Sequence, residues 1–152
     1  MTADAEFDRR VRGVIASAIR DRGRIPTIRE VAQSLASDLA DVEAAFGRMI
    51  EGRVFIPRQG SGEILAYNPF CNPPTGFTVT AAGRTWAAIC AWDALGVPAA
   101  LGTSGTIDAR CADCAAPIQT EVVVDGTATA PEGTIMQVAT PARDFWKNIY
   151  RT

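Results

Sequence analysis

The feature that most constrains the fold is a series of three amphipathic helical patterns in the first fifty residues. Apolar side chains recur at intervals of three and four over residues 5–22, over "IPTIREVAQSL" and over "SDLADVEAAFGRMIEG". Thr27 and Glu30 have the spacing of a capping box, and Gly23 and Gly52 follow the first and third patterns as stop signals. The sequence therefore predicts three helices here.

A predicted β-hairpin follows these helices, because two apolar runs flank a Gly-Ser-Gly turn in "RVFIPRQGSGEILAY". Three helices and a hairpin are typical of a winged helix, an architecture that can bind DNA through a helix in the major groove. The third helix, however, carries Asp38, Asp41, Glu43 and Glu51 against Arg48. Because phosphate binding needs cationic side chains, the sequence favours a helical lobe packed on the rest of the chain. DNA binding stays open as the alternative.

The stretch "YNPFCNPPTG", rich in Pro and Asn, predicts an irregular connector that contains Cys71. We place the boundary between two lobes here, with a helical, winged-helix-like lobe over 1–66 and a mixed lobe over 67–152. In the second lobe, "FTVTAAG" predicts a strand and a turn, and Thr85 predicts the cap of a helix that runs to about Leu95.

Further strands are predicted in "TSGTIDARC", "PIQTEVVVDG" and "GTIMQVAT", and a short helix in "ARDFWKNIYR". Short turns favour antiparallel pairing of successive strands. The expected fold class is α+β: a three-helix, winged-helix-like lobe followed by a small antiparallel sheet with helices.

Composition removes several kinds of chemistry. The 152 residues include no histidine, which excludes a Ser-His-Asp triad, a Cys-His dyad and a His-ligated zinc site within the chain. The net charge of −2 gives no global attraction to nucleic acid or to a membrane surface.

No apolar run is long enough to cross a bilayer and "MTADAEFDRR" lacks the layout of a secretory signal, so the expected location is cytoplasmic. There the four cysteines are expected to be free thiols, metal ligands or redox groups.

Cys90 and Asp93 are the first candidate site. On the helix predicted over 85–95 they are i and i+3 neighbours, and Trp86 lies four residues before Cys90, so all three share a face. A carboxyl against an apolar, aromatic wall can hold and deliver a proton, and a thiolate beside it is a soft ligand or a nucleophile. On spacing alone, a small core cysteine and a carboxylate facing water remain the favoured alternative.

Cys111 and Cys114 form a C-x-x-C pair, a spacing that can chelate a soft metal or form a redox disulfide. A closed four-ligand zinc site would need Cys71 and Cys90 as well, or a second subunit. The alternative is a structural cysteine with a second thiol beside it.

The stretch "TWAAICAWDALGVPAALGTSGTIDARCADCAAPI" resembles the core segment of the organomercurial (alkylmercury) lyase family. In that family a cysteine and an aspartate at this spacing precede a "D-x-L-x-x-P-A-L-x-G" stretch and then a "C-A-x-x-x-A-P" segment. The resemblance implies protonolysis of a carbon–mercury bond, with Cys90 as the thiolate that binds mercury and Asp93 as the proton donor. From their spacing, Trp86 and Trp92 are expected to be pocket walls. Cys111 matches a family cysteine that is regarded as structural.

The family's second catalytic cysteine follows a segment that resembles "PARDFWKNIYRT", and this sequence ends at Thr152. The resemblance therefore predicts a divergent or truncated member without that cysteine, in which mercury binds but its capture is weakened. No organic cofactor is expected. Mercury is expected as substrate and product, with Cys90, Cys111 and Cys114 as candidate ligands.

Three classes of function follow. The first is an enzyme like the alkylmercury lyases, acting on a small-molecule substrate. The second is a protein of the same fold that binds another small ligand or soft metal, or catalyses a different proton transfer. The third is a winged-helix regulator that responds to metal. A homodimer is left open.

Overall fold

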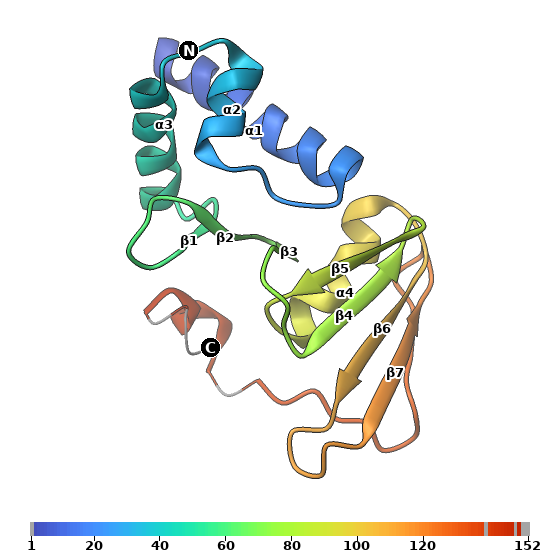
Figure 1. Cartoon of the computed structure of the whole chain (residues 1–152). Helices are drawn as coiled ribbons and strands as arrows, with labels where there is room; N and C mark the ends of the chain where they lie inside the picture. Colours follow the sequence, from blue (N-terminus) through green and yellow to red (C-terminus); the bar gives the residue numbers. More distant parts are fainter. Residues whose placement is uncertain (1, 139, 148, 150–152) are drawn as a thin grey trace.

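A computed structural model describes residues 2–138, 140–147 and 149. It begins with three helices, α1 (Ala3–Arg22), α2 (Ile28–Leu35) and α3 (Leu39–Glu51), as the sequence predicts (Figure 1). The predicted capping box is present: the Thr27 hydroxyl accepts from the Glu30 backbone N–H at 3.2 Å, and the Glu30 carboxylate accepts from the Thr27 N–H at 2.8 Å. These bonds satisfy backbone donors that would otherwise lack partners at the start of α2.

The described strands form one antiparallel sheet in the order β1-β2-β3-β5-β4-β6-β7-β8. The strands are β1 (Ile56–Pro57), β2 (Ile64–Tyr67), β3 (Phe70–Cys71), β4 (Phe77–Ala81), β5 (Arg84–Ala88), β6 (Gly105–Arg110), β7 (Pro117–Val122) and β8 (Ala128–Thr129). The fold is thus mixed α and β, with N-terminal helices followed by an antiparallel sheet. This is the predicted fold class.

The segment predicted as an irregular connector instead contributes a strand to the middle of the sheet. Only the Asn68–Pro69 turn, with its cis peptide bond, interrupts the chain between β2 and β3. Cys71 in β3 pairs with Ala66 on one side and with Ala87 on the other. A proline has no backbone N–H and therefore argues against a central strand, which is why the sequence predicted a connector. Here Pro69 occupies the turn, so the strand that follows it is intact.

The predicted helix from Thr85 to Leu95 is also wrong. Residues 84–88 are β5, which pairs with β4 over five registered residue pairs, and the turn between them uses left-handed φ values at Ala82 and Gly83. Helix α4 (Ala91–Leu101) begins later, continues past Leu95 and includes Pro98. Pairing with β4, which local periodicity cannot reveal, selects the extended conformation for Thr85 and Trp86.

The third predicted strand, in "GTIMQVAT", is absent from the described residues of that stretch, 133–138 and 140. β7 pairs instead with the short β8 just before this stretch. The chain then continues to a 3₁₀ helix, η1 (Ala142–Lys147), and the rest of the closing helix predicted over 142–151 lies outside the described residues except for residue 149.

The main core joins the N-terminal helices to the sheet and to α4. Phe46 of α3 packs edge-on against Phe55 with ring centroids 5.1 Å apart, and both are almost fully buried. The same cluster includes Val11 of α1, Val79 of β4 and Val97 of α4. α4 packs on β4 and β5, which fixes the start of this helix relative to the sheet (Figure 1). Among the described residues, no helix is long and apolar enough to cross a membrane.

Candidate active site

A cavity of about 850 Å³ lies at the start of α4. Its walls come from five separate parts of the chain: β1, the Asn68–Pro69 turn, the start of β4, the segment 89–96 and the C-terminal segment after residue 135. The lining is mostly apolar and includes Ile56, Phe77, Ile89, Trp92, Met136, Val138, Phe145 and Ile149. The lining also contains the thiol of Cys90 and the carboxyl group of Asp93.

Cys90 and Asp93 lie in the first turn of α4, where Cys90 is the N-cap residue. The Cys90 thiol donates a hydrogen bond to Asp93 Oδ2 at 3.4 Å, and the Ala94 N–H donates to the Cys90 carbonyl at 2.9 Å. The i, i+3 relation predicted from the sequence therefore brings the two side chains together, but at the start of a helix rather than near its end.

Burial is the largest cause of a raised pKa in both groups. Loss of solvent raises the pKa of Cys90, and so do the charge and the hydrogen bond of Asp93, whereas backbone N–H groups of Trp92 and Asp93 act in the opposite direction. Burial also raises the pKa of Asp93, opposed by the hydrogen bond from Cys90. The result is a carboxyl group with an increased affinity for a proton, within hydrogen-bond distance of a soft sulfur ligand.

The two predicted tryptophan walls have different positions. Trp92 lines the cavity and is 66% exposed, so it lies at the mouth. Trp86 is buried in β5, where its indole N–H donates to the Ala81 carbonyl at 3.1 Å and its ring contacts Phe70. It does not share a helical face with Cys90, and it is outside the set that lines the cavity.

The other three cysteines are free thiols that form no disulfide. Cys71 is buried in β3, while Cys111 and Cys114 lie in the turn between β6 and β7. Within the described part of the chain, no three Cys, Asp or Glu side chains gather in a way that could hold a metal ion. Cys90 therefore does not join Cys111 and Cys114 as a three-thiol site.

Sequence reasoning missed the walls that come from distant segments. Pro69 and Gly96 meet there: a Cβ added to Gly96 would lie 3.2 Å from Pro69 Cβ, so this glycine permits α4 to approach the turn closely. The Pro- and Asn-rich composition of 67–76 was a signal for an unusual turn, but nothing local indicates that α4 packs on it.

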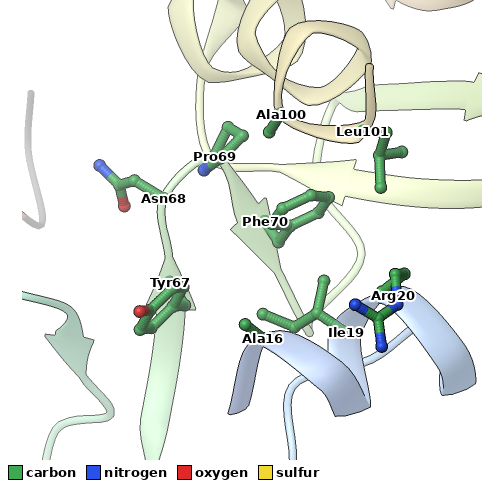
Figure 2. A pocket seen from close by; sticks show the side chains of 9 residues that line it. All are labelled: Ala16, Ile19, Arg20, Tyr67, Asn68, Pro69, Phe70, Ala100 and Leu101. Atoms are coloured by element: carbon green, nitrogen blue, oxygen red, sulfur yellow. The ribbon is translucent and has the colours of Figure 1, made fainter. Parts of the chain in front are cut away.

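A second, smaller cavity has a volume of about 330 Å³ and is bordered by α1 and α4. Figure 2 shows the side chains that line it. Ala16, Ile19 and Arg20 line one side of it, and Ala100 and Leu101 line the other. Asn68 and Pro69 border both cavities, so this turn is the wall between them. The described residues around the smaller cavity include no thiol or carboxyl group.

Comparison with known proteins identifies the family and a similar fold. A sequence model of the alkylmercury lyase family matches residues 70–152. Among solved structures, the crystal structure of the mercury-bound form of MerB2 has a similar fold, with a TM-score of 0.63 and 22% identity. The likeness covers 82% of this chain and 61% of that chain, so the present chain spans about three fifths of the length of its structural relative. No curated protein matches the sequence.

The family match includes the segment that holds Cys90 and Asp93 and the segments that form most of the larger cavity. It extends over more than half of the chain, and the similar fold covers most of the remainder. This protein therefore belongs to the alkylmercury lyase family.

Proposed function

We propose that the protein cleaves the carbon–mercury bond of an organomercurial by protonolysis, with Cys90 as the mercury ligand and Asp93 as the proton donor. The observation that carries the proposal is the Cys90–Asp93 hydrogen bond of 3.4 Å at the wall of an apolar cavity. Membership of the family supports it, as does the mercury bound to a protein of the same fold.

The first step is ligand exchange on the substrate R–Hg–X. The Cys90 sulfur forms a bond to mercury, the bond from mercury to X breaks, and the thiol proton passes to the Asp93 carboxylate while X leaves as an anion. Thiolate sulfur is a soft ligand and so is suited to a soft metal. The hydrogen bond between Cys90 and Asp93 supplies the path for the proton.

The second step is cleavage. Asp93 gives its proton to the carbon, the electron pair of the carbon–mercury bond becomes the new C–H bond, and R–H leaves. Mercury remains on Cys90 as Hg²⁺, without any change of oxidation state. A small thiol from solution loses its proton and supplies the second sulfur ligand. A second such thiol then exchanges with Cys90, to which its proton passes, and the mercury leaves bound to two small thiolates.

The environment suits each step. Apolar side chains around the cavity favour the organic group of the substrate over water. Burial raises the pKa of Asp93 and so favours the protonated form that the second step requires.

The test is release of benzene from phenylmercury in excess small thiol. We expect turnover by the wild type, and a fall of about 10²–10⁴-fold in Asp93→Asn, because that variant keeps the shape but loses the general acid. Cys90→Ser should lose turnover as well, and Cys114→Ser, which changes an exposed thiol outside the cavity, should retain it. Absence of turnover from folded wild-type protein with a free Cys90, or equal rates in Asp93→Asn, would overturn the proposal.

A further inference from the structure

The turn between β6 and β7 holds two thiols that the proposed reaction does not use. Cys111 and Cys114 are outside the lining of the larger cavity and neither forms a disulfide. Two backbone hydrogen bonds of 2.9 Å close the turn, from the Cys111 N–H to the Ala116 carbonyl and from the Ala115 N–H to the Cys111 carbonyl. Ala115 adopts a left-handed φ of 57° to allow this closure. The positions of both cysteine Cα atoms are therefore set by the hairpin.

Groups of the same turn influence Cys111. The backbone N–H groups of Cys114 and Asp113 and the Cys114 thiol lower the pKa of Cys111. The Arg110 guanidinium lies on the same turn and donates to the Ala115 carbonyl at 3.1 Å. Both thiols thus belong to one short turn that two backbone hydrogen bonds close.

The number of ligands limits which ion could bind. No third Cys, Asp or Glu of the described residues joins the two thiols in a metal-binding group. Zinc in a closed structural site needs four ligands, so this turn cannot supply one alone. Soft d¹⁰ cations such as mercuric or cuprous ions, in contrast, are stable with two thiolates. Cys114 is exposed and Cys111 is partly exposed, so an ion can reach both from solution.

We propose that Cys111 and Cys114 form a dithiolate site for one soft, two-coordinate d¹⁰ cation, separate from the cavity that contains Cys90. For mercuric ion, two S–Hg bonds form and the two thiols release two protons, with no redox change. The proposal goes beyond the cleavage reaction and does not depend on it, because the ion can come from any source.

The test uses the reduced protein under nitrogen in a Cys90→Ser background, with one equivalent of mercuric chloride and excess glutathione, followed by native mass spectrometry. A dithiolate site should give a chain that carries mercury without glutathione. Adding Cys111→Ser or Cys114→Ser should convert this species into a mixed adduct of mercury and glutathione, because one protein thiol leaves a coordination position open. Adding Cys71→Ser instead is the matched control and should leave the mercury-only species unchanged.

Two results would overturn the proposal. One is a mixed glutathione adduct, or no mercury, on the Cys90→Ser chain. The other is a mercury-only species that persists after Cys111→Ser. Circular dichroism would verify that each variant is folded, and we expect the Cys111 and Cys114 variants to fold because their turn is at the surface. Since no carbon–mercury cleavage is measured, failure here is distinct from failure of the lyase reaction.

Discussion

At the residue scale, the important pair is Cys90 and Asp93, because each alters the proton affinity of the other. Burial is the largest cause of the raised pKa of Cys90, and the charge of Asp93 and its hydrogen bond raise it further. The backbone N–H groups at the start of α4 act against this. A neutral side chain at position 93 should therefore lower the pKa of Cys90 while the backbone contribution remains.

We expect Asp93→Asn to shift the pH profile of Cys90 alkylation towards lower pH. Only the thiolate reacts with iodoacetamide, so the rate follows its fraction at each pH. The measurement is the rate of carbamidomethylation of the Cys90 peptide by mass spectrometry from about pH 6.5 to pH 10.5, a range of about two units either side of the ordinary thiol pKa. Cys111 in the same sample is the internal control, since its profile should be unchanged and lie at lower pH than that of Cys90. A profile that stays in place or moves to higher pH would contradict the role of the Asp93 charge.

At the element scale, the position of α4 depends on a close contact with the sheet. Gly105 of β6 pairs with Ala81 of β4, beneath Pro98 of α4. A Cβ at position 105 would lie 2.9 Å from the Thr80 carbonyl oxygen, 3.0 Å from Pro98 Cγ and 3.1 Å from Ala81 Cβ. Because one of these neighbours is backbone, the contact can be relieved only by moving a strand or the helix.

Gly105→Ala should accordingly lower the free energy of unfolding by about 1–3 kcal/mol, the usual effect of overpacking. Gly13→Ala is the matched control: it lies in α1 at an exposed position with nothing within 4 Å of the added Cβ. That change should stabilise the protein by up to about 1 kcal/mol through helix propensity. Urea unfolding of both variants measures the difference, and equal stabilities would show that α4 does not rest on this glycine.

At the scale of the whole molecule, the question is whether the two parts of the chain unfold together. The division into lobes at 1–66 and 67–152 stays a prediction, but the main core contains residues from both sides of it, including Phe46 and Val79. The sheet also continues from β2 to β3 across this point. A shared core and a shared sheet favour a single cooperative transition.

Two probes can test this, because Trp86, Trp92 and Trp146 all belong to the second part while α1, α2 and α3 belong to the first. Tryptophan fluorescence and far-ultraviolet circular dichroism should give the same urea midpoint. Phe46→Ala, which empties a buried aromatic site in α3, should cost about 3–5 kcal/mol and shift both midpoints together. A shift of the dichroism midpoint alone would mean that the two parts unfold independently.

Local sequence was sufficient for the features that depend on neighbours along the chain. The three N-terminal helices and the capping box of Thr27 and Glu30 follow from periodicity and end signals within a few residues. The contact between Cys90 and Asp93 follows from an i, i+3 spacing within one helical turn. The order of cysteine, aspartate and proline along this region is likewise enough to indicate the family.

Tertiary structure decided the features that depend on residues far apart in sequence. Trp86 is in a strand because β4 supplies its hydrogen-bonding partner, and Cys71 is in the sheet because β2 and β5 flank it. The cavity exists because β1, the Asn68–Pro69 turn, α4 and the C-terminal segment meet at one place. Such contacts arise from burial of apolar surface between elements, which no local pattern encodes.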